Sequence, residues 1–483
     1  MLSIKQIVEA TKGQLVCSDK FNSDDNFFKN IYCSEQSSES DKSFNIVIDS
    51  RLVKKNDIFI AIVGENKDGH DYVPCAVEKG ASLIIVSDKN SITSDCNFLL
   101  VKDTVLALGQ IAKYHLQTLK VKTIGITGSA GKTTTKDLLA QVLSKKFGKN
   151  HIVYPEGSFN NEIGMPLTVL KANESTEFLI LEMGASGIGH LKYLTGIAPL
   201  DYAIVLFVGH AHLSGFGSIE GVATAKSELV QGLKPTGVAI LNLDDENVCK
   251  MSKYAPGRTI FYSAKGVFSD IWAENVKLID NHPNFDLFTP AGTAHVKLKL
   301  LGKHNVTNAL AVAALLNELG EEVSEISQYL QDSKILSKHR LNIQTLSNGC
   351  VIIDDSYNAN PDSMKAGITC LMDVAKSYKH KGMHRTIAVL GQMLELGPQS
   401  DEIHKQLASY INKLPLDVAF VVGKYAKPLA DNLTVKKVYY ADNIQGVENE
   451  LSDYLCSNDI VLFKGSNGSK VWQLADRALK GGF

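Results

Sequence analysis

The sequence predicts an α/β protein of three domains: a small N-terminal α/β domain, a central P-loop domain with a mostly parallel sheet, and a C-terminal Rossmann-like, doubly wound domain. Three observations support this fold class. The chain has 483 residues, too many for one hydrophobic core. A glycine-rich loop lies between an apolar strand and a helical pattern. Beyond Lys338, strand-like runs alternate with helical segments, as in an open parallel sheet.

The predicted N-terminal domain spans residues 1–115. Apolar runs at 57–62 and 82–86 predict two strands that flank a helix. Ser50 and Arg51 lie in a loop beside these strands, where ligand-binding loops are found, although an ordinary turn is the alternative. The first residues resemble an amphipathic helix interrupted by charge, so we expect no signal peptide.

The predicted central domain, residues 116–337, contains the loop TGSAGKTT at 127–134. A strand before it and a helix after it are the context in which such a loop binds phosphate, because backbone N–H groups and a helix N-terminus then face one spot. Lys132 would neutralise the β- and γ-phosphates, and Thr133 would hold a magnesium ion. The spacing differs from the usual G-x-x-x-x-G-K-[ST], since Ile126 stands at the first glycine position. A glycine turn with a surface lysine is the alternative interpretation.

Two polar positions follow later strands of the same domain. Glu182 comes near the end of the apolar run 178–184, where a P-loop protein places a second magnesium ligand; a helix cap is the alternative. The strand at 202–207 leads to a glycine-flanked loop that contains His212. That histidine is either a surface residue or a contact to a metal or phosphate.

Two further positions lie in predicted helices. Lys226 lies inside a helix, and composition does not distinguish it from a solvated lysine. Asn305 lies in the basic, amide-rich start of an Ala/Leu-rich helix, which favours either a nucleotide contact or a helix cap.

The predicted C-terminal domain spans residues 338–483. Carboxylates and amides, among them Asp355 and Asn358, follow its first strand, and the carboxyl ends of parallel strands are where such sheets bind ligands. The strand-like runs lie at 351–354, 386–390, 418–422, 438–440 and 460–463.

The composition is typical of a soluble globular protein, with 44% hydrophobic and 21% charged residues. A formal net charge of −2 gives no basic face for nucleic acid. Eight cysteines occur singly, without the C-x-x-C pairs of a zinc or redox motif. No apolar run approaches the roughly 18 residues that a membrane span needs. We therefore expect a cytoplasmic protein, in a compartment where ATP and magnesium are available. We also expect a monomer, although nothing in the sequence determines the oligomeric state.

These motifs resemble the Mur ligase family, which uses ATP to form amide bonds in the peptide stem of bacterial peptidoglycan. The resemblance covers nearly the whole chain, and its last two segments are similar to those of family members that add a dipeptide. The chain departs from the family at His339, where glycine is usual. The segments are TGSAGKTT (127–134), SFNNEIGMPLT (158–168), Glu182, HLSGFGS (212–218), AKSEL (225–229), GKHNVTNALA (302–311), DDSYNANPDSM (354–364) and VLGQMLELG (389–397).

The resemblance implies an ATP site with magnesium. Lys132, Glu182, His212 and Lys226 would be the catalytic residues. Thr133 and Glu182 would bind one Mg²⁺ ion and His212 a second. Lys226 would be a ligand as a carbamate, a modification that turns a cation into an anionic ligand. The implied ATP-binding residues are Gly128, Ser129, Ala130, Gly131, Lys132, Thr133, Thr134, Asn305 at the adenine, Arg340 near the γ-phosphate, and Asp355.

The resemblance also implies the substrates. The enzyme would join D-alanyl-D-alanine to the terminal carboxylate of UDP-N-acetylmuramoyl-tripeptide through an acyl phosphate, with release of ADP and phosphate. The implied substrate-binding residues are Ser50 and Arg51 at the uridine nucleotide, Asn160 and Asn161 at the muramoyl peptide, and Tyr357 and Asn358.

Two other functions are consistent with parts of the sequence. One is a related ligase that adds a single amino acid, against which the segment 355–363 argues. The other is a nucleotide-dependent switch, which would hydrolyse ATP or GTP without regard to either substrate. It gives no reason for three large α/β blocks around one loop.

Overall fold

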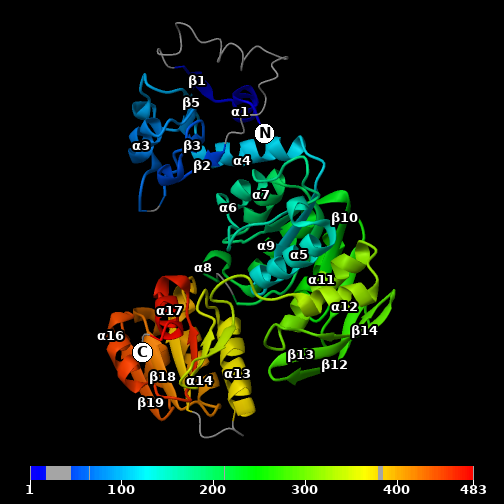
Figure 1. Ribbon diagram of the computed structural model, residues 1–483, viewed down its shortest axis with the longest axis vertical. Coiled ribbons are helices and arrows are strands. Elements are labelled where there is room, and N and C mark those ends of the chain that lie inside the picture. Colours follow the sequence, from blue (N-terminus) through cyan, green and yellow to red (C-terminus); the bar gives the residue numbers. More distant parts are fainter. Residues whose placement is uncertain (1, 18–44, 65, 211–212, 379–384, 482–483) are drawn as a thin grey trace. The chain divides into compact units, whose positions relative to one another are not determined.

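The computed structural model describes residues 2–17, 45–64, 66–210, 213–378 and 385–481 (Figure 1). They divide into two compact units. The domain boundaries near residues 115 and 337 stay predictions. The first unit comprises Met1–Thr123, Asn150–Met183 and Tyr193–Pro199, and the second comprises Ile124–Lys149, Gly184–Lys192 and Leu200–Phe483.

The first unit contains a five-stranded sheet with the order β1-β5-β4-β3-β2. Its strands pair in parallel, except that β1 is antiparallel to β5. Strand residues alternate between two cores, so that Ile58 and Ile60 contribute to one and Phe59 to the other. The elements are α1 (Ile4–Thr11), β1 (Gln14–Val16), β2 (Ile46–Val47), β3 (Ile58–Ile60), α3 (Val73–Glu78), β4 (Leu83–Val86), β5 (Phe98–Leu100) and α4 (Thr104–Gln117).

Three later elements also belong to the first unit: β7 (Ile152–Val153), α6 (Gly164–Val169) and β8 (Phe178–Glu182). β7 and β8 pair in parallel, and β8 is buried along its whole length. The predicted strand at 178–184 is thereby confirmed, with Glu182 as its last residue.

The second unit carries the phosphate loop between β6 (Lys122–Thr127) and α5 (Lys132–Phe147). Its strands follow the order β14-β13-β12-β11-β10-β9-β6, and those from β6 to β12 pair in parallel. The other elements of this part are β9 (Leu200–Val205), α8 (Leu213–Phe216), α9 (Ile219–Gln231), β10 (Leu233–Asn242), α10 (Glu246–Cys249), β11 (Thr259–Ser263), β12 (Ile271–Ile279), β13 (His282–Thr289), β14 (Gly292–Lys297), α11 (Asn305–Glu318) and α12 (Val323–Asp332). Helix α7 (His190–Ile197) runs across the boundary of the two units.

Strands β12, β13 and β14 pair antiparallel, an arrangement that was not predicted from the sequence. They form two hairpins. The first turns through Asp280 and Asn281, whose φ angles of 50° and 64° match the left-handed conformations that tight hairpin turns require. The second turns before Gly292, at φ 134°.

The last part of the second unit is a six-stranded sheet of order β15-β16-β20-β17-β18-β19, parallel except for β15 at its edge. Alternate strand residues enter two separate cores: Ile353 and Leu390 pack with α13 to α15, and Ile352 and Val389 with α16 and α17 (Figure 1). Helices therefore cover both faces, which confirms the doubly wound prediction. The elements are β15 (Asn342–Thr345), β16 (Val351–Asp354), α13 (Pro361–Tyr378), β17 (Thr386–Gly391), α14 (Ser400–Ile411), β18 (Val418–Val422), α15 (Lys427–Asn432), β19 (Lys437–Ala441), α16 (Gln445–Tyr454), β20 (Ile460–Lys464) and α17 (Val471–Leu479).

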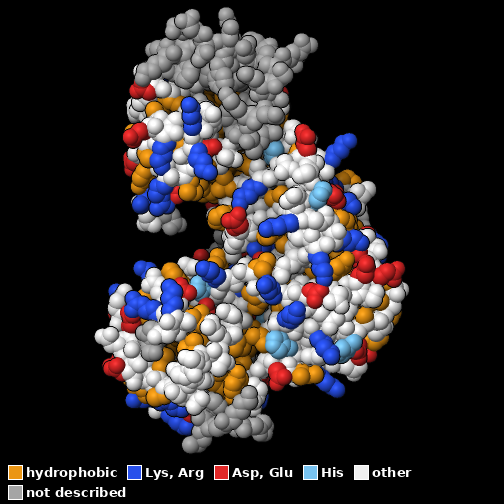
Figure 2. Space-filling model, viewed as in Figure 1, with side chains coloured by type: hydrophobic (Ala, Val, Ile, Leu, Met, Phe, Trp, Pro, Cys, Tyr) orange, Lys and Arg blue, Asp and Glu red, His pale blue; other side chains and the backbone are white. Residues whose placement is uncertain are grey.

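The surface carries mixed charge. On the face shown in Figure 2, lysine and arginine side chains lie scattered among aspartate and glutamate over the described residues. No helix in the described ranges is long and apolar enough to cross a membrane. The cysteines in these ranges are free thiols, and burial raises the pKa of Cys370 to about 12.

Candidate functional site

The phosphate loop folds as a strand, a tight turn and a helix start. Gly131 is the residue before α5, and its φ of 85° is a conformation that favours glycine. A Cβ at this position would lie 2.5 Å from Oδ1 of Asn308. The first intrahelical bond runs from Thr135 N to Gly131 O at 2.9 Å. The N–H groups at such a helix N-terminus point towards one spot, an arrangement that favours binding of an anion.

The side chains of Lys132 and Thr133 both make hydrogen bonds. Lys132 bonds within the phosphate loop, and Thr133 bonds to an arginine far along the chain. Nζ of Lys132 donates to Gly128 O at 2.7 Å. The hydroxyl of Thr133 is almost completely buried and accepts a bond of 3.2 Å from Nη2 of Arg340. The Arg340 guanidinium also lies over the ring of Tyr357, 4.1 Å from its centroid. The structure thus brings Arg340 and Tyr357 to the phosphate loop.

His339 precedes that arginine with a φ of 59°, the left-handed region in which glycine is favoured. Its Nδ1 lies 2.7 Å from Oδ2 of Asp354 at the end of β16. This contact with the carboxylate holds the ring, so a residue other than glycine is accommodated there.

Lys226 is buried inside α9, with 3% of its surface exposed. Burial, and secondarily the charge of Lys132, holds the pKa of Lys226 well below its ordinary range. The structure therefore rejects the solvated-lysine alternative. An uncharged amine is also the form that can add carbon dioxide to become a carbamate.

Asn305 connects to the loop through a residue that sequence reasoning missed. Its Nδ2 donates to Leu301 O at 2.7 Å, and its Oδ1 accepts from Nδ2 of Asn308 at 2.8 Å. Asn308 Oδ1 is the atom that faces Gly131. The available signal in the sequence was a second asparagine three residues after Asn305, in a segment otherwise rich in Ala and Leu.

Asp355 is held by a second missed residue, Lys464, whose side chain is 2% exposed. Nζ of Lys464 donates to Oδ2 of Asp355 at 2.5 Å and to the carbonyl of Asn358 at 3.3 Å. Oδ1 of Asp355 accepts from Leu341 N at 3.2 Å. The predicted Asp355 and Asn358 therefore share one cation.

The predicted site residues of the first unit form two groups, Ser50 with Arg51, and Asn160 and Asn161 with Glu182. Asp49 accepts three bonds of 2.7 to 3.1 Å from the Arg51 guanidinium, and these hold the pKa of Asp49 at about 2. Nζ of Lys79 donates to Ser50 O at 3.0 Å. These contacts fix the Ser50–Arg51 turn.

In the other group, Nδ2 of Asn160 donates to Oε1 of Glu182 at 2.8 Å, and Glu182 is 1% exposed. Oδ1 of Asn161 accepts from Gly164 N at 2.9 Å and so caps α6. His212 lies outside the described residues.

The described residues contain no cluster of three or more His, Cys, Asp or Glu that could hold a metal. Among the predicted Mg²⁺ ligands that lie in the described residues, only Glu182 is a His, Cys, Asp or Glu. The other two are Thr133 and Lys226. Hydroxyl and carboxylate oxygens are ligands that Mg²⁺ prefers, and a carbamate adds another anionic oxygen, so the donor types fit this ion.

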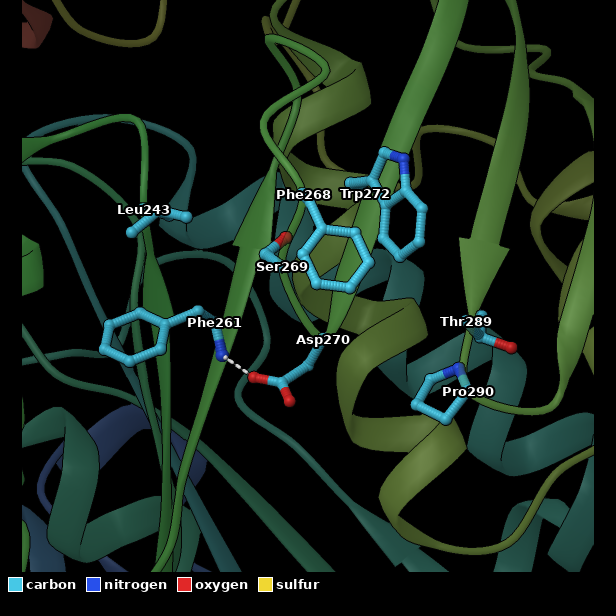
Figure 3. A pocket seen from close by; sticks show the side chains of 8 residues that line it. All are labelled: Leu243, Phe261, Phe268, Ser269, Asp270, Trp272, Thr289 and Pro290. Carbon is cyan, nitrogen blue, oxygen red and sulfur yellow. Dashed lines mark hydrogen bonds between the residues drawn. The ribbon is translucent and has the colours of Figure 1, made fainter.

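A cavity of about 510 Å³ lies elsewhere in the second unit, beside β11 and β12. Figure 3 shows the rings of Phe268 and Trp272 next to each other on its wall. Asp270 accepts from Phe261 N at 2.8 Å there. None of the predicted site residues lines this cavity, so we assign it no part in the site.

The chain is similar to known proteins of one family over most of its length. The chain matches the family models described as Mur ligase family, catalytic domain (residues 44–126), Mur ligase middle domain (126–316), and Mur ligase, glutamate ligase domain (339–467). It is 37% identical to a UDP-N-acetylmuramoyl-tripeptide–D-alanyl-D-alanine ligase of Mycobacterium bovis over 78% of this chain and 77% of the relative. It is 34% identical to the ligase of the same name from Haemophilus influenzae, over 88% and 91%.

Solved structures are similar as well. A crystal structure of MurF from Acinetobacter baumannii superposes with a TM-score of 0.82 at 29% identity, covering 99% of this chain and 98% of the other. MurF ligase from Thermotoga maritima, solved in complex with ADP, superposes with a TM-score of 0.77 at 29% identity, covering 90% and 96%.

Proposed function

Because the chain belongs to the Mur ligase family, we propose that it joins D-alanyl-D-alanine to UDP-N-acetylmuramoyl-tripeptide at the expense of ATP. The relatives that it matches over three quarters or more of their length carry this activity in their names. The structural observation that best supports this function is the hydrogen bond from Arg340 to Thr133 in the phosphate loop. Arg340 follows the central part of the chain in the sequence. That bond brings the last third of the chain to the nucleotide site.

The chemistry follows from the poor reactivity of a carboxylate as an acyl donor. In the first step an oxygen of the tripeptide carboxylate attacks the γ-phosphorus, and the bond from that phosphorus to the bridging oxygen breaks to release ADP. In the second step the amine of D-alanyl-D-alanine attacks the acyl carbon, loses a proton, and phosphate leaves. Charge develops first on phosphoryl oxygens and then on a tetrahedral oxyanion.

We assign the first charge to Lys132 and the N-terminus of α5. ATP would replace the Lys132 bond to Gly128 O, so that the ammonium group faces the phosphates. We assign Arg340 to the γ-phosphate, because it donates to the Thr133 hydroxyl and its guanidinium can bind two oxygens at once. Asn305 and Asp355 are proposed contacts to the nucleoside.

For Mg²⁺ we propose Thr133 and Glu182 as ligands of one ion, His212 as a ligand of a second, and the carbamate of Lys226 as a further anionic ligand. The ions would supply positive charge to the phosphoryl oxygens. The support is the burial of the Lys226 side chain, which lowers the pKa of its amine and so favours the neutral form that adds carbon dioxide. Replacement of Lys226 by Ala should remove nearly all activity, and short carboxylic acids should partly restore it. Full activity of that variant would contradict the carbamate.

We further propose that Ser50 and Arg51 bind the uridine nucleotide and that Asn160, Asn161, Tyr357 and Asn358 bind the peptide substrates. ATP and a UDP-linked precursor are cytoplasmic metabolites, which supports a cytoplasmic enzyme. Domain boundaries near residues 115 and 337 and a monomeric state are part of the proposal. Limited proteolysis with mass measurement tests the first, and sedimentation tests the second.

The deciding experiment is an amine-dependent phosphate-release assay with mass measurement of the product. We expect release only when ATP, the UDP-linked tripeptide and D-alanyl-D-alanine are all present, with diaminopimelate- and lysine-containing tripeptides compared. Activity with a single amino acid but none with the dipeptide would overturn the proposal. Hydrolysis independent of both substrates would indicate a nucleotide switch. Lys132→Ala should release no phosphate.

A further inference from the structure

The strands β6 and β9 keep exchanging hydrogen bonds past their ends. Leu206 N donates to Thr127 O at 3.0 Å, and Ser129 N donates to Phe207 O at 2.8 Å. The second bond lies one residue out of register with the first, and from it the parallel pattern would continue with a bond from Gly209 N to Ser129 O. The phosphate loop turns away at this point, so that bond is not made.

The hydroxyl of Ser129 takes the place of its own carbonyl. Oγ accepts from Gly209 N at 2.9 Å and donates to Gly209 O at 3.0 Å. The serine is 7% exposed, so these two bonds are shielded from water. Alanine at position 129 would leave both backbone groups of Gly209 without this partner, a costly arrangement for buried polar groups.

The carbonyl released from the ladder accepts a bond from the C-terminal part of the chain. Nδ2 of Asn360 donates to Ser129 O at 3.0 Å. Two residues later, Oδ2 of Asp362 accepts from His210 N at 2.8 Å. The turn that begins α13 therefore contacts both the phosphate loop and the segment after β9.

Gly209 has no room for a side chain in this arrangement. A Cβ would lie 2.3 Å from the Phe207 ring and 2.4 Å from Oδ2 of Asp362. Val208 is fixed independently, because its N–H donates to Oδ2 of Asp245 at 2.8 Å. Side chains of Ser129, Asp245 and Asp362 thus hold the N–H groups of three consecutive residues, 208 to 210.

We propose that Ser129 is a positioning residue that couples docking of the α13 turn to the conformation of residues 207–210. The Ser129 hydroxyl bonds to Gly209 and so fixes the segment after β9. Because the hydroxyl makes this contact in place of the Ser129 carbonyl, the carbonyl is available to Asn360. Ser129 acts through these neighbours rather than by touching the reacting atoms. The inference rests on the proposed ligase function, because its kinetic consequence is loss of alignment between the phosphate loop and the C-terminal residues.

The test compares Ser129→Ala with Ser327→Ala in the full-length chain. Ser327 is a matched control, since it is 5% exposed and its hydroxyl donates to His295 O at 2.7 Å, outside the site. For Ser129→Ala we expect kcat to fall about 10–100-fold while the Kd for ATP stays nearly unchanged, because alignment is lost and the loop backbone is kept. Hydrogen exchange in a peptide covering 206–210 should be faster in this variant and unchanged in Ser327→Ala.

Asn360→Ala provides a second, independent measurement. If the two residues act together, its effect on kcat should nearly vanish in the Ser129→Ala background. Effects that multiply would overturn the inference, as would wild-type kcat or unchanged exchange in Ser129→Ala. Ser129→Cys, which keeps the volume and weakens both bonds, replaces Ser129→Ala if that variant does not fold. A wild-type chain that fails to ligate counts against the proposed function, whereas the exchange result stands apart from it.

Discussion

Arg340 donates a hydrogen bond of 3.2 Å to the hydroxyl of Thr133, a residue 207 positions earlier in the chain. Its guanidinium is held at the same time over the ring of Tyr357. A planar cation supported in this way loses little conformational freedom when it meets a phosphate, because its orientation is already set. The contact is one of those that bring the C-terminal part of the chain to the nucleotide.

Replacement of Arg340 by Ala should lower kcat about 100-fold, as expected for loss of a group that stabilises charge in the transition state. Arg340→Lys should recover only part of this, since lysine keeps the charge without the planar fork or the stacking. Steady-state phosphate release measures both. Arg258, whose Nη1 pairs with Glu318 on the surface, is the control, and Arg258→Ala should retain wild-type kcat. Equal rates for the two alanine variants would contradict the assignment.

Gly131→Ala should abolish tight ATP binding. The left-handed φ of 85° costs an alanine about 1–2 kcal/mol, and the new Cβ would press on Asn308 at 2.5 Å. Gly157→Ala is the matched control, because Gly157 also has positive φ, 64°, but no atom within 4 Å of the added Cβ. Gly157→Ala should therefore be destabilised only by the conformational cost of its positive φ, and its ATP affinity should stay as in the wild type. Calorimetric ATP titration measures the effect of each variant on ATP binding, and thermal unfolding measures its effect on stability. Similar ATP affinities would show that the loop tolerates the side chain.

The Lys464–Asp355 pair should behave as a coupled unit in stability. Lys464→Met leaves a largely buried carboxylate without its cation and should lower the free energy of unfolding by about 3 kcal/mol. Adding Asp355→Asn should restore part of the loss, since the uncompensated charge is then removed. Urea unfolding of the two single variants and the double variant measures the coupling. Additive losses would mean that the pair contributes no interaction of its own.

The lowered pKa of Asp49 predicts that the stability of the fold decreases at acidic pH. Hydrogen bonds from Arg51 lower this pKa from 3.8 to about 2, so the folded state holds this proton less tightly than the unfolded state. The pair therefore stabilises the fold above the unfolded pKa, and that contribution is lost as pH falls from about 4 towards 2. In Arg51→Ala, carboxyl NMR titration should place the pKa of Asp49 higher than in the wild type but still below 3.8, because the backbone N–H of residue 51 continues to donate to Oδ1 of Asp49. Asp68, whose pKa is lowered by bonds from His70, should not move and serves as the internal reference.

Affinity for the uridine-linked substrate should also fall in Asp49→Ala, because Arg51 would lose the carboxylate that orients it. ATP affinity should stay as in the wild type. A loss of both affinities would indicate a general folding defect rather than a role at the uridine nucleotide.

The sequence by itself determined the elements and the phosphate loop, because these depend on local pattern. Apolar runs fixed the strands β8, β17 and β20 almost to the residue, and the glycines around Lys132 identified the loop before any neighbour was known. The antiparallel hairpins at 271–297 were not predicted. The first turns through Asp280 and Asn281 at positive φ rather than through the Asn-Gly or Asp-Gly pair that marks such turns in a sequence.

Only the tertiary structure decided which side chains meet. Lys226 is an ordinary helical lysine in the sequence, and its perturbed pKa arises from burial beside Lys132. Ser129 is one more polar residue of the loop until Gly209 and Asn360, 80 and 231 residues away in the chain, are seen to bond to it. Hydrogen-bond partners and desolvation depend on segments that the fold brings together, and local sequence carries no record of them.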